Sequence, residues 1–146
     1  MTKAILILGV LSILISFSCV KQCCVPKINA EEWKLILNNS KGIKSGERSR
    51  ENLLKGVKQY LAKARYAYNR ALRDGFKCNA KIILEIIVLG SGKIENVKII
   101  AKDYDFPSFD VDLIETIKKW DFGTIPNLND TTIIQYPFVF THNKCN

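Results

Sequence analysis

The stretch KIILEIIVLGSGKIENVKIIA, residues 81–101, decides the fold of this chain. Its first part, 81–89, is too rich in β-branched residues to favour a helix, so we expect a strand there. The Gly-Ser-Gly at 90–92 tolerates positive φ angles, which favours a hairpin turn. In the last part, 93–101, polar residues alternate with apolar ones, as they do in a half-buried strand. The sequence therefore predicts an antiparallel β-hairpin.

Amphipathic helices are expected on both sides of this hairpin. Over 48–74 apolar residues recur every three or four positions, and Gly75 follows as a left-handed C-terminal cap. Over 107–120 acidic residues come early and basic residues late, which suits the helix dipole. A shorter helix is expected to start at Asn29, and the glycines and polar residues of 38–47 are expected to break the chain.

The segment 131–141 is expected to form the last strand. The residues that would share one of its faces are Ile134, Tyr136, Phe138 and Phe140. Pro137 removes an amide donor, and proline is tolerated in a sheet essentially only at an edge or a bulge. We therefore expect an edge strand that can accept an extended peptide or a second copy of the chain. Pro137 confines this pairing to the preceding residues, Thr131, Thr132, Ile133, Ile134 and Gln135.

The N-terminus has the pattern of an export signal. Lys3 precedes an apolar run, 4–15, as in a signal peptide. The run meets Ser-Phe-Ser before Cys19, which resembles the bacterial lipoprotein cleavage box, so we expect Cys19 to become the acylated first residue. The alternative is a retained membrane anchor over 4–20. Cleavage is favoured, because an anchor would put the lysines that follow on the translocated side, against the positive-inside tendency.

The chain of 146 residues is expected to hold one folded domain. Residues 1–18 would be the signal peptide, 19–47 a tether with a short peripheral helix, and 48–146 the domain. The charged fraction of 25% and the apolar fraction of 47% are ordinary for a globular domain, which argues against wholesale disorder.

Positive charge is concentrated in the first half of this exported part. The whole chain has a net charge of +8. Residues 20–81 hold 15 Lys or Arg and 5 Asp or Glu, whereas 82–146 hold 6 and 9. In an exported protein, a basic region of this kind favours binding to an anionic lipid surface or to an acidic envelope partner over binding to nucleic acid. The alternative is that it is only a solvated face of a helix. The basic surface is expected at Lys55, Lys58, Lys63, Arg65, Arg70 and Arg73.

The sequence lacks the residue patterns of catalysis and metal binding. His142 is the only histidine and lies in the C-terminal tail, so no catalytic triad is expected. Asp103 and Asp105 fall in a loop, while Asp110 and Asp112 fall at a helix start, where the dipole explains acidic residues. The two adjacent cysteines after the signal cannot easily face one tetrahedral ion. We expect no enzyme activity, no cofactor and no metal site.

The order of elements over roughly 50–141 resembles that of the TonB C-terminal domain superfamily, and most of all its AgmX/PglI C-terminal type. The resemblance rests on four segments, YNRAL at 68–72, LGSGKI at 89–94, IKKWDF at 117–122 and YPFVF at 136–140. It implies an α+β fold in which a long helix is followed by ββαβ. The sheet would be three-stranded and antiparallel, with strand order 2-1-3 and one helix packed on it.

The resemblance also implies a disulfide and a mode of binding. In that fold the last strand runs antiparallel to the first, which would bring Cys78 and Cys145 close enough for a disulfide, with two free thiols as the alternative. Domains of this kind bind partners by strand addition. TonB itself adds a retained membrane helix and a long Pro-rich spacer, and this sequence shows neither, so an energy-transducing role is not expected.

The sequence thus predicts a non-enzymatic lipoprotein on the periplasmic side of the cell envelope, held at the membrane by its lipid. Its domain would bind an envelope protein or peptide through the edge strand, or pair with a second copy, and would not bind nucleic acid. The alternative is a structural envelope lipoprotein that docks on anionic lipid or peptidoglycan through its basic helix.

Overall fold

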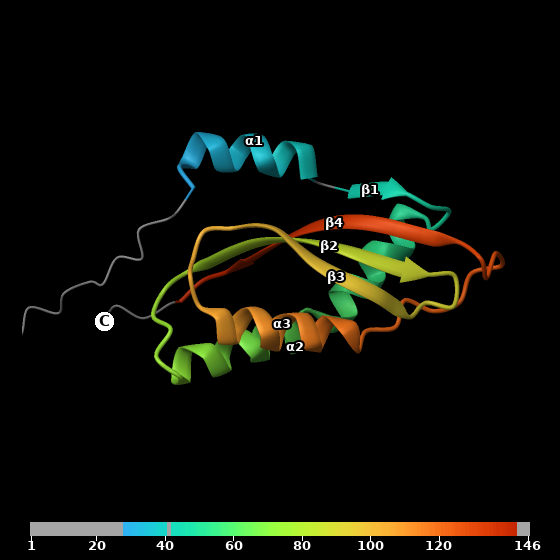
Figure 1. The fold of residues 1–146 in the computed structure, drawn as a ribbon. Helices are drawn as coiled ribbons and strands as arrows, with labels where there is room; N and C mark the ends of the chain where they lie inside the picture. Colours follow the sequence, from blue (N-terminus) through green and yellow to red (C-terminus); the bar gives the residue numbers. More distant parts are fainter. Residues whose placement is uncertain (1–27, 41, 143–146) are drawn as a thin grey trace, which may run out of the picture.

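The computed structural model describes residues 28–40 and 42–142, so the predicted signal peptide, Cys19 and Cys145 lie outside the described residues. The four strands that it describes form one antiparallel sheet with the order β1-β4-β2-β3 (Figure 1). The predicted α+β class is confirmed. The elements in chain order are α1 (Ala30–Ser40), β1 (Gly42–Ser45), α2 (Arg50–Arg73), β2 (Ala80–Leu89), β3 (Ile94–Lys102), α3 (Pro107–Lys118) and β4 (Thr131–Phe140).

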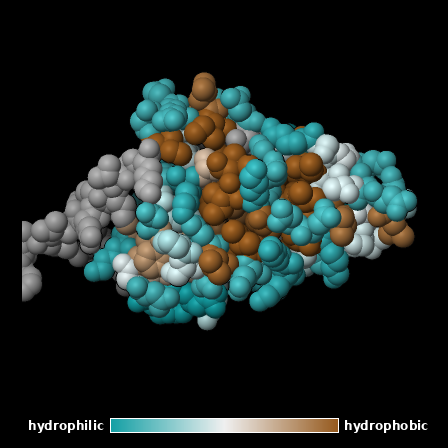
Figure 2. Space-filling view, in the orientation of Figure 1, coloured by the Kyte–Doolittle hydropathy of each residue, from teal (hydrophilic) through white to brown (hydrophobic). Residues whose placement is uncertain are grey.

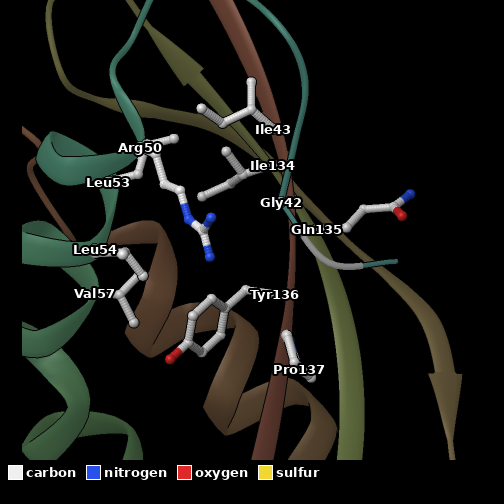
Figure 3. Close-up of a pocket in the computed structure, with 10 residues that line it drawn as sticks. All are labelled: Gly42, Ile43, Arg50, Leu53, Leu54, Val57, Ile134, Gln135, Tyr136 and Pro137. Atoms are coloured by element: carbon white, nitrogen blue, oxygen red, sulfur yellow. The ribbon is translucent and has the colours of Figure 1, made fainter. Parts of the chain in front are cut away.

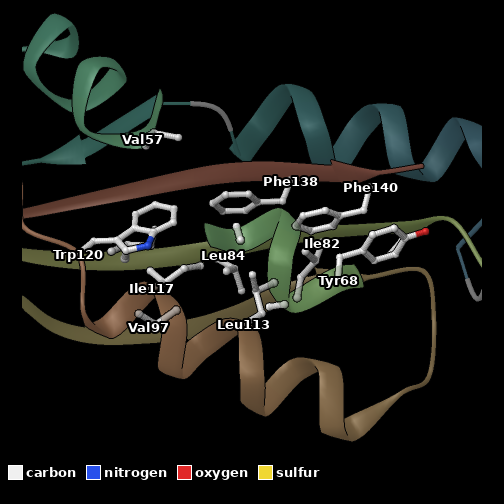
Figure 4. Packing of buried hydrophobic residues seen from close by; sticks show 14 of the residues in the cluster. Val57, Tyr68, Ile82, Leu84, Val97, Leu113, Ile117, Trp120, Phe138 and Phe140 are labelled. Carbon is white, nitrogen blue, oxygen red and sulfur yellow. The ribbon is translucent and has the colours of Figure 1, made fainter. Parts of the chain in front are cut away.

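The main core lies between the sheet and the two helices α2 and α3, which pack together on one of its faces (Figures 1 and 4). Alternate residues of β2 point into this core because successive side chains of a strand face opposite sides. These residues, all fully buried, are Ile82, Leu84, Ile86 and Val88. They meet apolar residues of the helices and of β4, among them Val57, Ala64, Tyr68, Leu113, Ile117, Phe138 and Phe140.

Helix α1 covers part of the opposite face of the sheet (Figure 1). Its Trp33 is buried, and the Nζ atom of Lys81 on β2 lies 5.8 Å from the centre of the indole ring. The predicted cap of this helix is confirmed, because the amide of Glu32 donates to the side-chain oxygen of Asn29 over 2.8 Å. Figure 2 shows apolar surface over the sheet, between α1 and the layer of α2 and α3.

The predicted three-stranded sheet with an edge strand at its C-terminal end is wrong. A fourth strand, β1, lies outside β4, with Gly42 opposite Gln135 and Ile43 opposite Ile134. This strand lies within 38–47, where the sequence predicted only a break. All four of its residues are exposed, so it carries no alternation of apolar and polar side chains from which a strand could be predicted.

Trp120, which ends the apolar stripe of the segment 107–120, and Phe122, which follows it, both belong to the core. Trp120 is 1% exposed and stacks on Tyr60 with 5.4 Å between the ring centres. Its ring also meets Phe138 of β4 edge-on at 6.1 Å. The turn after α3 is therefore anchored by the same side chains that support β4.

The predicted C-terminal cap and disulfide have different outcomes. Gly75 follows α2 with a φ of +104°, so the predicted left-handed cap is confirmed. Cys78 is disulfide-bonded in the structure, but Cys145 lies outside the described residues, and their pairing stays a prediction. No helix of the described ranges combines the length and apolar character that a membrane crossing needs.

Candidate functional site

A clamp formed by Gly46, Glu47 and Arg48 holds the chain against the start of β4. Gly46 has a φ of +105°, and a Cβ atom there would lie only 2.4 Å from the Cα atom of Thr132, so glycine permits this approach. The amide of Glu47 donates to Oδ1 of Asp130 over 3.0 Å. The Oγ1 atom of Thr132 donates to Oδ2 of Asp130 over 2.6 Å and accepts from the amide of Arg48. The clamp fixes the point at which β1 leaves β4.

The side chain of Arg48 completes this clamp from inside the protein. Although charged, it is only 2% exposed, and its guanidinium donates to the carbonyls of Leu89 at 2.7 Å, Gly90 at 3.2 Å and Phe122 at 3.3 Å. Burial lowers the pKa of Arg48, against the opposing charge of Asp130. Sequence reasoning missed this residue, because a single arginine in a polar loop carries no signal that it is buried.

A groove runs between α2 and the outer side of β4. Its first part is bounded by β1, by the start of α2 and by the middle of β4. Figure 3 shows Arg50, Ile134 and Tyr136 directed into this part, and Gln135 directed away from it. A second part continues along Leu61, Ala62 and Arg65 of α2 and the last residues of β4. The two parts adjoin each other, because Tyr136 and Pro137 line both, and we refer to them together as the groove.

The backbone of β4 is open along the second part of this groove. Pro137 lies opposite Ile83 of β2, and because proline has no amide hydrogen, this pair is not one of the hydrogen-bonded pairs of the ladder. The carbonyl of Pro137 therefore points to the outer side, and so do the amide and carbonyl groups of Gln135 and Val139, two residues away. Those of Gln135 face Gly42 of β1. Those of Val139 face no strand in the described part of the chain.

The apolar side chains that border this open stretch are exposed. Val139 is 56% exposed, and Leu54 and Leu61 on α2 are each 39% exposed. Single exposed apolar side chains are normal, but here they lie along one groove beside unpaired backbone groups. The arrangement combines the two features that a peptide-binding sheet edge needs, a free ladder and apolar contacts.

No protein-family model, no curated protein and no solved structure matches this chain. The likeness to TonB C-terminal domains is therefore a resemblance carried by the segments quoted above, and what it implies for function is a proposal.

The predicted partner-binding edge, Thr131–Gln135, is covered and not open. Ile133, Ile134 and Gln135 pair with β1, and Thr132 is fully buried under the clamp. Pro137 itself has no strand partner on the outer side of β4 among the described residues. However, the chain's own strand occupies the part before Pro137, so the open part is Tyr136–Phe140.

The predicted basic surface lies along α2. Lys55, Lys58, Lys63, Arg65 and Arg73 are exposed, whereas Arg70 is partly buried and pairs with Asp112 over 3.0 Å. Several of these cations lie near tyrosine rings of the same helix, such as Lys63 at 5.1 Å from the centre of Tyr60. Only Arg65 of the predicted set lines the groove, joined there by Arg50, which was not predicted.

The paired carboxylates have structural partners. Asp110 accepts from Tyr104 Oη at 2.7 Å and also binds Lys102 Nζ, while Asp103 accepts from the amide of Lys81 at 2.7 Å. Burial, followed by the hydrogen bond to Asp110, raises the pKa of Tyr104, so this hydroxyl stays a donor. Within residues 28–40 and 42–142, no group of three His, Cys, Asp or Glu side chains is placed to hold a metal ion.

Proposed function

We propose that this chain is a non-enzymatic protein-interaction domain that binds an extended partner segment in the groove between α2 and β4. The partner adds a strand to β4 beside Tyr136–Phe140, past the residues of β4 that pair with β1. Its side chains on the helical side enter the groove between α2 and the sheet. The proposal keeps the strand addition expected from the sequence and moves it past Pro137.

One observation carries this proposal. The outward amide and carbonyl groups of Val139 lack a strand partner among the described residues, at a site bordered by the exposed Leu61. An open sheet edge offers main-chain hydrogen bonds for affinity and side-chain pockets for specificity. Proteins usually blunt such edges with charges or cover them, because they invite pairing. This stretch of β4 instead has apolar neighbours.

The partner is another protein segment and not a second copy of this domain. If two copies joined through this stretch of β4 by antiparallel pairing, their α2 helices would lie on the same face of the joint sheet. The exposed cations of α2, among them Lys58 and Arg65, would then oppose each other across the junction. This like-charge contact disfavours the homodimer that the sequence left open.

A proline at position 139 tests the proposal, because it removes one outward amide and leaves the ladder between β4 and β2 in place. The probe is a capped peptide with valine at alternate positions, and binding is followed by NMR titration of the backbone amides. We expect Val139→Pro to abolish the chemical-shift changes along β4, and Val139→Ala, which keeps the amide, to retain them.

Two results would contradict the proposal. One is a peptide that binds the Val139→Pro variant as tightly as it binds the wild type, provided that these two proteins have the same melting temperature. The other is a wild-type domain whose shift changes map to β3, the other edge of the sheet, instead of to β4 and α2.

Export and lipid attachment at Cys19 complete the proposed function and rest on the sequence pattern alone. They would hold the domain at the envelope membrane, on the periplasmic side. Mass spectrometry of the mature protein tests them, since a chain that does not begin at an acylated Cys19 would exclude this attachment.

The exposed cations of α2 support a second candidate, a structural lipoprotein that docks on an anionic envelope surface. Lys55, Lys63 and Arg73 lie outside the groove and remain exposed, so they could face lipid headgroups while the groove stays empty. Reversing Lys55 and Lys63 to Glu would abolish binding to anionic vesicles under this candidate. The same change would leave groove binding intact under the first.

A further inference from the structure

The flank of α2 that borders the groove has a regular pattern of charge. Residues three or four apart share one side of a helix, and cations alternate with apolar residues along this side. The residues of this flank, which we call the rim, are Arg50, Leu54, Lys58, Leu61 and Arg65. Four of the five line the groove, and Lys58 lies one turn from both Leu54 and Leu61.

The three cations of the rim have no carboxylate partner among the described residues. Arg65 donates only to the carbonyl of Thr141, at 3.4 Å, and no ion pair involves Arg50 or Lys58. Arg70 on the same helix contrasts with them, because it is paired with Asp112. The rim therefore keeps its positive charge available to a partner.

Among residues 28–40 and 42–142, no acidic side chain lines the groove to offset this charge. The only charged residues of these ranges along its two parts are Arg50 and Arg65. Glu51 is the one acidic residue of α2, and it lines neither part. A segment with basic residues would be repelled here, and a neutral segment would gain nothing from the rim.

The repeat of the rim also fits the repeat of a strand. Successive rim residues are about 4.5 to 6 Å apart along the helix axis. Side chains on one face of a strand are about 6.6 Å apart. A strand laid beside Tyr136–Phe140 can thus place one same-face side chain near each of Lys58, Leu61 and Arg65 in turn.

We propose that the partner segment is acidic, with the pattern acid-x-apolar-x-acid on the face that meets α2. Its carboxylates pair with Lys58 and Arg65, and its apolar side chain lies against Leu61, which stands between them on the rim. The positions marked x point to the other face of the sheet and are free to vary. This inference rests on the proposed function, because it assigns a chemistry to the segment bound in that same groove.

Three capped peptides of equal length test this inference on the full chain. The first is Asp-Thr-Val-Thr-Asp-Thr-Val-Thr, the second has Asn in place of Asp, and the third has Lys there. We expect the Asp peptide to bind about tenfold more tightly than the Asn peptide, and the Lys peptide to bind least. The advantage of the Asp peptide should shrink as salt rises from about 0.05 to about 0.5 M, because the rim is exposed.

A charge-reversed rim and a matched control identify the residues responsible. The rim variant carries Glu at Arg50, Lys58 and Arg65, and we expect it to lose the preference for Asp and to favour the Lys peptide. The control variant carries Glu at three exposed lysines away from the groove, which are Lys98, Lys118 and Lys119. It has the same net charge as the rim variant and should bind the three peptides as the wild type does.

The outcomes separate this inference from the proposed function. If the Asp and Asn peptides bind equally well, and Val139→Pro abolishes both, groove binding stands and the acidic partner is wrong. If no peptide binds, both ideas fail. If the wild type instead binds phosphatidylglycerol vesicles and the rim variant does not, the rim recognises a lipid surface, and the acidic peptide is again wrong.

Discussion

The two halves of β4 differ more than their sequences suggest. Both direct every second side chain toward the core, and both pair with β2 without interruption. The first half, Thr131–Gln135, is closed by β1 and by the clamp around Arg48. The second half, Tyr136–Phe140, has a core behind it and an open edge in front. The comparison shows that a strand can be an interior strand along one half and an edge strand along the other.

The difference arises outside β4 itself. Gly46 and Arg48 hold the chain at Thr132, so the residues just before them run alongside Ile133–Gln135. At Gly42, where φ is +110°, the pairing with β4 ends. The clamp therefore determines which half of β4 pairs with β1. The aromatic core stabilises the half that does not.

Trp120→Ala should have the largest effect, because it removes the support behind the open half. The indole is buried between Tyr60 and Phe138, and a cavity of this size should lower the free energy of unfolding by about 3 to 5 kcal/mol. Urea denaturation measures this change. Leu128→Ala, at a side chain that is 63% exposed, serves as the control and should stay within about 0.5 kcal/mol. Similar midpoints for the two variants would refute the assignment of Trp120 to the core.

Arg48→Ala should be next, since it opens the clamp of the closed half. The carbonyls of Leu89, Gly90 and Phe122 would lose their buried donor, which should cost about 2 to 3 kcal/mol in urea denaturation. Arg48→Lys keeps the charge but not the planar fork, so an intermediate loss is expected. A loss below about 0.5 kcal/mol for the alanine variant would mean that solvent replaces the guanidinium, and the clamp would then not depend on it.

Gly46→Ala should lower the free energy of unfolding least of the three variants. It tests how β1 is held against β4. A methyl group would collide with the backbone of Thr132, in addition to the strain of a positive φ, at a cost of about 2 kcal/mol. Gly75→Ala is a matched control, with a φ of +104° and open space around the position. Hydrogen exchange should accelerate at Gln135 only in the Gly46 variant. Equal exchange in both variants would show that the close approach does not hold β1 in place.

Much of the fold could be predicted from the sequence because its signals are local. The β-branched run of β2, the Gly-Ser-Gly turn and the apolar stripes of α2 and α3 each follow from the period of a strand or a helix. Strand β1 could not be predicted in this way, because its four exposed residues have no such period. Its pairing depends on backbone groups of β4 that lie about ninety residues away in the chain.

The candidate site divides in the same way. The sequence by itself determined that Pro137 removes one amide donor from a strand and that α2 carries excess positive charge, because one residue or one helix is enough to specify each. Only the tertiary structure decided which half of β4 stays open and which cations face it. That choice depends on the buried guanidinium of Arg48 and on the approach of Gly46 to Thr132, contacts between segments that are distant in sequence. Such contacts leave no periodic trace in the chain, so packing alone determines which part of β4 lacks a neighbouring strand.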